Sequence, residues 1–387
     1  NVPALRFPEF TDEWKKEQLG DIADFSKGAG ISKEQLSEKG EPCILYGELY
    51  TKYKSEVIYD IISKTDIDST KSVRSQANDV IIPSSGETAE DIATARCVLK
   101  NNILLGGDLN IIRLHKHSGS FMSYQLNGKR KYDIAKVAQG VSVVHLYAEH
   151  LKGVNTYNPC MEEQEKIARL LALLDERIAT QNKIIEDLKK LKSAIIEMEY
   201  GNMAKSISHI GDFIEQTSKR NKDSAILNVL SVSNSQGFIQ QSEQFENRIV
   251  ASDDTSNYKI VARNDFAFNP ARINVGSIAR LTTFERGIVS PMYICFRTKN
   301  NLFPEYLDYF FESKRFFAEI QKRLEGSVRQ CLSFEGLCNI PLCIPTVEVQ
   351  QQIGKRLSTL AKEIKLEIDF LELLQRQKRF LLHQMFI

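Results

Sequence analysis

Residues 159–167 read Pro-Cys-Met-Glu-Glu-Gln-Glu-Lys-Ile, and residues 345–353 read Pro-Thr-Val-Glu-Val-Gln-Gln-Gln-Ile. Pro, Glu, Gln and Ile coincide at an offset of 186 residues, and six more identities follow at this offset, the last being Lys192 with Lys378. Because a repeat of so long a period determines the domain plan of a chain, the sequence predicts the order module, helix, module, helix. The expected boundaries are 1–158 and 201–344 for the modules, and 159–200 and 345–387 for the helices.

Both repeated segments have the apolar pattern of a long helix. Apolar residues recur in alternating steps of three and four, which is the heptad seam of a coiled coil. Pro159 and Pro345 stand where a helix start tolerates a missing N–H, and Gly201 follows the first helix as a stop. The expected seam residues are Ile167, Leu171, Leu174, Ile178, Gln181, Ile185, Leu188, Leu191 and Ile195 in the first helix, and Ile353, Leu357, Leu360, Ile364, Glu367, Leu371, Leu374 and Leu381 in the second.

An apolar stripe this narrow has to be buried against another helix, and the nearest candidate is the repeat itself. A two-fold relation between the halves requires antiparallel packing, in which Gln181 and Glu367 would meet at the centre and set the register. The expected fold is α+β: two globular domains joined by two long helices packed as an antiparallel coiled coil, with a pseudo-two-fold internal repeat. The alternative is ordinary core packing of both helices inside one large domain.

The modules repeat more faintly than the helices. Leu19-Gly20-Asp21 recurs as Ile210-Gly211-Asp212, Asn78-Asp79 recurs as Asn264-Asp265, and Gly140-Val141-Ser142 has a counterpart near residues 326–328. Short β-like runs at 43–46, 79–82, 109–114, 266–268 and 292–296 alternate with Gly, Asn and Ser loops, and a helix is expected over 124–139 and 305–325. Each module is therefore predicted to be mixed α+β.

The composition is that of a soluble protein of about two domains: 387 residues, 42% hydrophobic, 26% charged, with a net charge of +1. No stretch approaches the roughly 18 apolar residues of a membrane helix, and the first residues lack a signal-peptide layout. We therefore expect a cytoplasmic protein with no membrane partner. Seven cysteines form no C-x-x-C pair, which favours free thiols and no metal site.

Several loops have the residue types that contact nucleic acid. Arg pairs with guanine and Asn with adenine in the major groove, and clustered Lys and Arg contact phosphates. For any single loop residue, a solvated loop is the alternative. The residues expected to bind DNA are Lys27, Tyr46, Glu48, Tyr50, Lys52, Ser84, Ser85, Thr88, Lys129 and Arg130 in the first module, and Asn269, Arg272, Asn274, Ser277, Lys314 and Arg315 in the second.

Catalytic motifs are absent from the sequence. There is no Asn-Pro-Pro-Tyr run, as expected of an amino-methyltransferase, and no G-x-x-x-x-G-K-[ST] run for ATP. Glu13-Trp14-Lys15 and Glu363-Ile364-Lys365 resemble the tail of a nuclease motif, but such triplets arise often by chance. The sequence therefore predicts no catalytic residue, with a stand-alone nuclease as a minor alternative.

Two variable modules, each followed by a long helix that opens with Pro-x-x-Glu-x-Gln-x-x-Ile, resemble the specificity subunit of a type I restriction-modification system. The first module is similar to a target recognition domain at Trp14-Lys15-Lys16-Glu17-Gln18-Leu19-Gly20-Asp21 and at residues 28–33, and the second at residues 269–277 and 287–291. The resemblance covers nearly the whole chain.

The resemblance implies a non-catalytic subunit that directs an adenine-specific DNA methyltransferase and an ATP-dependent endonuclease. Each module would read one half of a split target in double-stranded DNA, while the helices would fix the gap and dock two methyltransferase subunits. Two restriction subunits, which translocate and cut DNA, would complete the complex. S-adenosylmethionine, Mg²⁺ and ATP would belong to these partners. A coiled-coil scaffold that joins two protein-binding modules is the alternative function.

Overall fold

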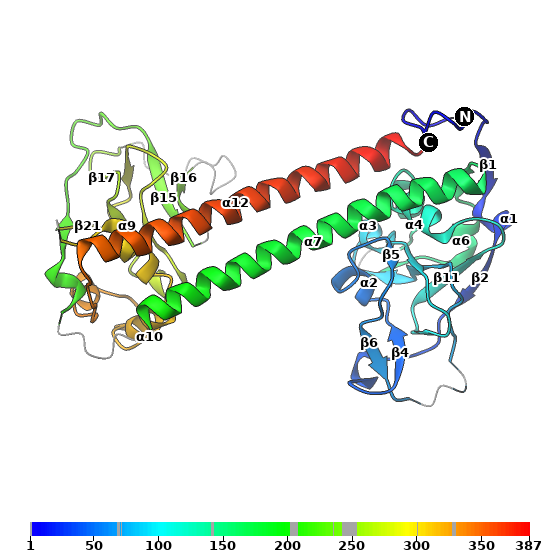
Figure 1. The fold of residues 1–387 in the computed structure, drawn as a ribbon, viewed down its shortest axis with the longest axis horizontal. Helices are drawn as coiled ribbons and strands as arrows, with labels where there is room; N and C mark the ends of the chain where they lie inside the picture. The colour runs from blue at the N-terminus through cyan, green and yellow to red at the C-terminus, as the bar shows by residue number, and fades with distance from the viewer. Residues whose placement is uncertain are drawn as a thin grey trace. The chain divides into compact units, whose positions relative to one another are not determined.

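The computed structural model describes residues 2–67, 70, 72–140, 143–201, 208–234, 236–241, 254–299, 301–326 and 330–387. Its contacts divide the chain into unit 1, residues 1–183 and 369–387, and unit 2, residues 184–368. The helices α7 (Met161–Tyr200) and α12 (Val347–Gln384) each contribute one end to unit 1 and the other to unit 2 (Figure 1). Both units combine helices with sheets, which confirms the predicted α+β class. The repeat at residues 141, 142, 327 and 328 lies outside the described residues.

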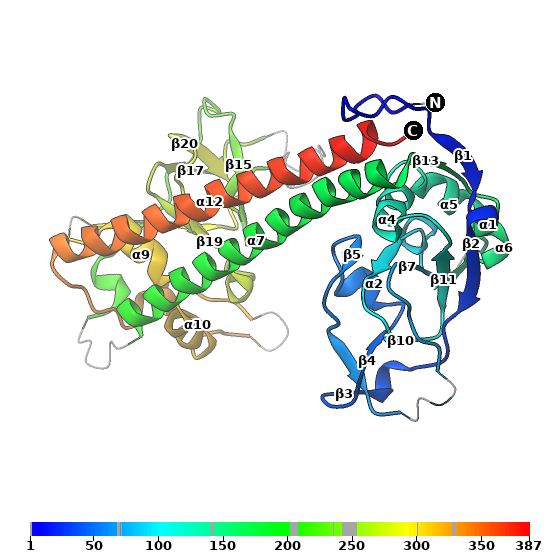
Figure 2. The same cartoon turned by 45° about the vertical axis from the view of Figure 1, so that its right-hand side comes forward.

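The described residues of unit 1 form two sheets, two strand pairs and several short helices. The larger sheet has the order β2 (Ala23–Lys27), β11 (Leu109–Leu114), β7 (Asp79–Pro83), β9 (Arg96–Val98) and β5 (Val57–Ile58), antiparallel except between β5 and β9. Figure 2 shows β2, β11 and β7 side by side. The second sheet has the order β10 (Leu104–Leu105), β4 (Glu41–Ile44), β6 (Ser63–Thr65) and β3 (Leu36–Ser37). In the two separate strand pairs, β1 (Lys15–Gln18) lies beside β13 (Asn155–Asn158), and β8 (Ser85–Gly86) lies beside β12 (Val144–His145). The helices are α1 (Leu19–Ile22), α2 (Glu48–Thr51), α3 (Ala89–Ile92), α4 (Gly119–Asn127), α5 (Lys131–Val137) and α6 (Ala148–Lys152).

In its described residues, unit 2 also has two sheets, each of four strands. The first has the order β14 (Ile214–Thr217), β21 (Ile294–Thr298), β18 (Phe266–Phe268) and β19 (Ile278–Arg280), all antiparallel. The second has the order β16 (Gly237–Gln240), β15 (Val229–Ser233), β20 (Arg286–Val289) and β17 (Lys259–Ala262), with β15 and β20 parallel. The short helices are α9 (Pro304–Phe310), α10 (Lys314–Gln321) and α11 (Phe334–Cys338).

The repeated Asn-Asp pair forms the same turn in both modules. Asn78 and Asn264 have positive φ angles of 81° and 70°, a region that Asn enters more readily than most residues. Asp79 and Asp265 are buried, and each accepts a hydrogen bond from the backbone N–H three residues earlier. Each carboxylate also pairs with an arginine of the neighbouring strand, β11 in unit 1 and β21 in unit 2. The faint sequence repeat therefore marks a structural turn.

A buried glutamine fastens the start of each long helix to its module. Gln164 accepts a hydrogen bond from the Ser118 N–H at 3.0 Å, and Gln350 accepts one from the Phe303 N–H at 2.8 Å. Each glutamine also donates to the carbonyl of the repeat proline that precedes its helix. Ser118 and Phe303 are the N-cap residues of α4 and α9, so the glutamine satisfies a helix-terminal N–H. This shared contact accounts for the Gln of the sequence repeat.

Inside each unit, the start of one long helix packs with the end of the other. In unit 1 the start of α7 and the end of α12 share an apolar cluster that includes Ile167, Leu171, Leu381 and Leu382. In unit 2 the end of α7 and the start of α12 share a cluster that includes Ile196, Tyr200, Ile353 and Leu357. The two helices therefore run in opposite directions within each unit.

Burial follows the expected seam at most positions but departs from it near the end of α7. Leu171 and Leu357 are fully buried, and Gln181 is only 4% exposed. The prediction that Leu191 belongs to the seam is wrong, because its side chain is 50% exposed. Ile196 and Tyr200 enter the core of unit 2 instead, so the buried face is displaced there. The meeting of Gln181 with Glu367 stays a prediction.

The helix expected near the end of each module is in fact two shorter helices. In unit 1, α4 ends at Asn127, the N–H of the following Gly128 bonds the Tyr124 carbonyl at 2.9 Å, and α5 begins at Lys131. In unit 2, Ser313 separates α9 from α10, since its hydroxyl accepts the Phe316 N–H at 3.2 Å. The chain thus leaves the helical conformation at Gly128 in unit 1, and the Ser313 N-cap starts a new helix in unit 2, so each expected helix is divided in two.

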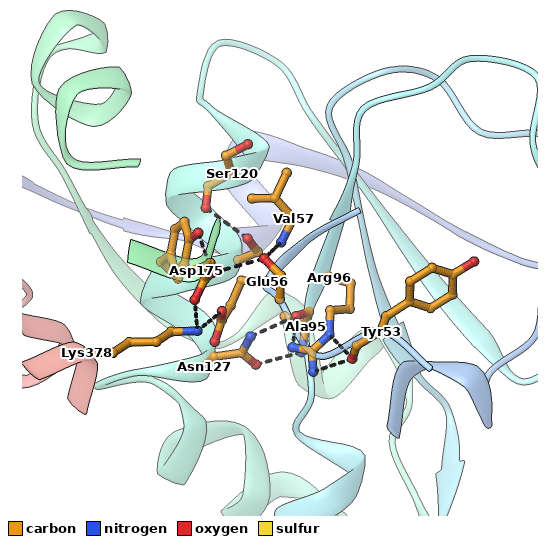
Figure 3. A network of polar contacts seen from close by, with 12 residues as sticks. Tyr53, Glu56, Val57, Ala95, Arg96, Ser120, Asn127, Asp175 and Lys378 are labelled. Carbon is orange, nitrogen blue, oxygen red and sulfur yellow. Dashed lines mark hydrogen bonds and ion pairs between the residues drawn. The ribbon is translucent and has the colours of Figure 1, made fainter. Parts of the chain in front are cut away.

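A partly buried lysine holds the end of α12 within unit 1. Lys378 forms ion pairs with both Glu56 and Asp175 (Figure 3). Asp175, on α7, also accepts hydrogen bonds from the Tyr124 hydroxyl at 2.8 Å and the Ser55 hydroxyl at 3.0 Å. Burial raises the pKa of Glu56, Lys378 opposes that shift, and the charge of Asp175 adds to it. Two buried carboxylates therefore share Lys378 as their ion-pair partner, and the charge of Arg96 also lowers the pKa of Glu56.

Unit 2 has a related but more exposed contact. Lys192 pairs with Glu312 at 2.7 Å, and its ammonium lies 5.2 Å from the ring centre of Tyr309. Lys378 lies 5.9 Å from the ring centre of Tyr124, so the repeat identity of the two lysines reflects an ammonium placed near a tyrosine ring in each unit. The Glu312 side chain is 47% exposed, which makes this the weaker of the two contacts.

Replacing Gln164 with Ala should lower the free energy of unfolding by about 1–3 kcal/mol, because a buried N–H and a buried carbonyl lose their partner. Gln350→Ala should have a similar effect through unit 2. Gln351→Ala, at an exposed neighbour on α12, is the matched control and should change stability by less than about 0.5 kcal/mol. Denaturant unfolding of the full chain measures all three, and equal values for Gln350→Ala and Gln351→Ala would contradict the assigned contact.

Lys378→Met should destabilise the chain by about 3–5 kcal/mol at neutral pH, since it leaves two buried carboxylates without their cation. Lys378 opposes the rise of the Glu56 pKa, so its removal raises that pKa further, and protonation of Glu56 favours folding of the variant more than of the parent. The loss should therefore shrink as the pH falls from neutral toward the ordinary glutamate pKa of 4.5. Lys192→Met is the matched control and should cost less than about 1 kcal/mol. Unfolding curves across this pH range test the prediction, and a pH-independent loss for Lys378→Met would contradict it.

Candidate nucleic-acid interface

The loop after β7 is held by its own side chains and backbone. Ser84 is buried, and its N–H donates to the Asp108 carbonyl at 2.7 Å. The Ser85 hydroxyl donates to the Asp108 carboxylate at 3.3 Å. Thr88 is exposed and caps α3, accepting the Asp91 N–H at 3.1 Å. Of the three predicted contacts in this loop, Ser85 and Thr88 lie where a large ligand can reach them, whereas Ser84 supports the loop from inside.

The predicted residues of segment 46–52 have different roles. Tyr46 is 39% exposed, while Glu48 is 5% exposed. The Glu48 carboxylate accepts hydrogen bonds from the Leu45 N–H at 3.0 Å and from Lys52 at 2.7 Å, and also binds Ser63. Glu48 therefore holds the segment in shape, and Tyr46 and the outer part of Lys52 remain available for contact.

A hollow of about 750 Å³ in unit 1 lies between the 30–36 loop and the 45–52 segment, and Tyr46 and Lys52 line it. Lys27, just before this loop, places its ammonium 5.9 Å from the ring centre of Tyr147. Tyr50 is half-buried beside Gly86, and burial raises the pKa of its phenol. The structure thus brings together the loop that follows Lys27 and the segment 46–52, which the sequence indicated as separate candidates.

In unit 2 the predicted loop 269–277 divides in the same manner. Asn269 is buried, and its amide oxygen accepts the Ala271 N–H at 3.1 Å. Ser277 is 2% exposed and donates to the Val232 carbonyl. Arg272 and Asn274 are exposed, and neither side chain makes a hydrogen bond or ion pair within the described part of the chain. Asn269 and Ser277 therefore hold the loop in shape, and the side chains of Arg272 and Asn274 face solvent.

The two basic clusters are not equivalent. Arg130 turns inward: it donates to the Ile387 carbonyl at 2.6 Å, pairs with Asp133 at 3.0 Å and covers the Tyr157 ring. It therefore packs inside unit 1 against Ile387, which its place in a Lys-Arg-Lys run did not indicate. Lys129 beside it is half-buried, Lys314 on α10 is exposed, and Arg315 is half-buried.

Two polar sites lie outside the predicted set. Arg96, 8% exposed, donates to the carbonyls of Tyr53 and Ala95 near Glu56 (Figure 3). No local pattern marks this residue, because its partners are backbone carbonyls, one of them distant in sequence. The second site is a basic loop in unit 2 that contains Lys219, Arg220 and Lys222. The sequence itself indicates this loop, because three of the four residues 219–222 are basic.

The described ranges contain neither a cluster of metal ligands nor a membrane-spanning helix. No group of three or more His, Cys, Asp or Glu side chains in them is arranged to hold a metal ion. No helix there is both long and apolar enough to cross a membrane. The Trp14 of the Glu-Trp-Lys triplet is buried, and its indole donates to Glu163 at 3.3 Å, so this triplet contributes to the core of unit 1.

The chain is similar to known proteins over almost its whole length. The Type I restriction enzyme MjaVIII specificity subunit of Methanocaldococcus jannaschii is 22% identical over 416 aligned positions, covering 97% of this chain and 92% of that protein. The S subunit of a type I restriction-modification system from M. genitalium has the same fold, with a TM-score of 0.64, 16% identity and coverage of 100% and 99%. A chain from a structure on complex assembly and conformational transition of the type I R-M system has a TM-score of 0.55, 12% identity and coverage of 97% of both chains.

The model of the family described as the Type I restriction modification DNA specificity domain matches the chain twice, at residues 11–190 and 206–376. Each match begins near the start of a module and extends into the long helix that follows it. Since the two matches together cover most of the residues, this protein belongs to the type I restriction-modification DNA specificity family.

Proposed function

We propose that this chain reads a bipartite target in double-stranded DNA, one half with the module of each unit. The supporting observation is that each unit has its own pair of sheets, its own core and its own exposed loops, while the anchors that hold these parts are the same in both. A repeated scaffold with different exposed side chains is suited to two different half-sites. Phosphate contacts position such a reader, and base contacts give it specificity.

The two long helices set the gap between the half-sites in this proposal. α7 has 40 residues and α12 has 38, and a helix rises by about 1.5 Å per residue. We propose that they pack as an antiparallel coiled coil with Gln181 and Glu367 at its centre. Half-sites read from one face of DNA lie about 34 Å apart, one helical turn, a separation that helices of this length can span.

The chemistry belongs to partner subunits in this proposal. Two methyltransferase subunits would dock on the helices and use S-adenosylmethionine, and two restriction subunits would use ATP and Mg²⁺. Membership of the specificity family supports this division, as does a sequence without Asn-Pro-Pro-Tyr or G-x-x-x-x-G-K-[ST] motifs. The chain itself would supply recognition and spacing to an adenine-specific methyltransferase.

A change of about one helical turn in Leu171–Ile195, matched in Leu357–Leu381, should change the unspecified gap and leave both half-sites intact. The physical reason is that a rigid helix transmits an added turn as a displacement of the module at its end. Sequencing of methylated adenines in cells that carry the altered chain measures both properties. Altered half-sites with a constant gap would contradict the ruler role.

Arg272→Ala should relax or abolish reading of one half-site only, the one assigned to unit 2. A bidentate arginine–guanine contact contributes about 1–3 kcal/mol of discrimination, which corresponds to roughly 5- to 150-fold. Arg263→Ala is the control, because Arg263 is also exposed in unit 2 but its charge is paired with Glu285. Methylation rates on duplexes with single-base changes in each half-site provide the measurement, and unchanged discrimination would assign Arg272 to a solvated loop.

A further inference from the structure

We propose that a basic hollow in unit 2 binds a phosphate of the DNA backbone. The hollow has a volume of about 700 Å³ and lies between the loop that follows β14 and strand β20. Among the described residues that line it, the cations are Lys219, Arg220 and Lys222 on the loop and Arg286 on the strand, and the carboxylate is Asp223. This inference rests on the proposed function and assigns a specific anchoring site to it.

The loop that carries three of these cations is internally ordered. Asn221 is fully buried, and its side chain both accepts from the Ile226 N–H at 3.1 Å and donates to the Ile226 carbonyl at 2.9 Å. The Asn221 carbonyl accepts the Ser224 N–H at 2.9 Å, and the Lys219 carbonyl accepts the Ile260 N–H at 2.8 Å. The cations therefore extend from a fixed backbone, which lowers the conformational entropy cost of binding.

The positive charge of the hollow is not neutralised by the protein around it. Within the described residues, Lys219, Lys222 and Arg286 form no ion pair, and Arg220 donates only to the neutral amide of Asn257, at 2.8 Å. The cationic side chains are all exposed. A site with four cations and one carboxylate attracts an anion and releases counterions from DNA when it binds.

The geometry favours a phosphate on a large molecule over a small free anion. Small anions are commonly held by converging backbone N–H groups, but the N–H groups of Asn221, Ser224 and Ile226 are all used inside the loop or by its neighbours. The cations lie on the open surface instead, where a rigid duplex can approach them. DNA is the polyanion that this family recognises, and its backbone presents one phosphate after another along such a surface.

The corresponding loop of unit 1 lacks this charge. It follows β2, which pairs with β11 as β14 pairs with β21. In the hollow that it lines, Lys33 and Lys52 stand against Glu34, Glu48 and Asp108. The excess of cations is therefore a property of unit 2 and not of the shared scaffold.

The test measures how salt weakens DNA binding by the full chain in complex with its methyltransferase partners. For the double variant Lys219→Gln/Lys222→Gln, the slope of log K against log salt should become shallower by about 0.9 for each phosphate that the variant no longer neutralises. Affinity for target and non-target duplexes should fall by the same factor, and the methylated motif should stay unchanged. Lys219→Arg/Lys222→Arg should keep the slope, as should Lys322→Gln, which removes an exposed lysine already paired with Glu319.

Three outcomes would overturn the inference in distinguishable ways. An unchanged slope for the double variant, with target preference intact in the parent complex, would remove the hollow from the DNA contact and leave the proposed function standing. Competition by inorganic phosphate at constant ionic strength, abolished in the double variant, would make the hollow a small-anion site. A parent complex without any target preference would contradict the proposed function and this inference together.

Discussion

The narrow apolar stripe of the two long helices is the constraint on which the rest of the structure depends. A 40-residue helix with polar side chains on most of its surface cannot leave that stripe in water, and it has too little apolar surface to form a core alone. Each unit buries part of this stripe by combining the start of one helix with the end of the other. Ile167 joins an apolar core cluster of unit 1, and Ile353 joins the apolar core of unit 2. Neither unit is complete without both helices.

Polar contacts then fix the register in which the long helices pack against these apolar cores. Gln164 and Gln350 join each helix start to a neighbouring helix N-terminus, and Lys378 joins the end of α12 to carboxylates of unit 1. Burial of unpaired groups would cost more than such contacts contribute when formed, so they act mainly by excluding other registers. The exposed loops, in contrast, are free to vary because the scaffold does not depend on them.

The sequence was sufficient for the parts of the fold that depend on local pattern. The long helices begin two residues after Pro159 and Pro345, and the strands at 109–114 and 266–268 have the predicted bounds. Long-range contacts were not predictable in this way: Arg96 binds backbone carbonyls, and Arg130 turns inward to Ile387 although its sequence context is that of a basic surface. Among the candidate site residues, Glu48, Asn269 and Ser277 are buried because their side chains bond nearby backbone groups, a geometry that residue type alone does not indicate.

The central claim is that this chain supplies a bipartite DNA specificity to a methyltransferase. Single-molecule sequencing of methylated adenines, in host cells with and without this gene, tests it most directly. The account predicts the loss of one split motif, two short half-sites around a fixed gap, when the gene is removed. An unchanged methylation pattern in cells that express the complete system would contradict it and would favour a scaffold that joins two protein-binding modules.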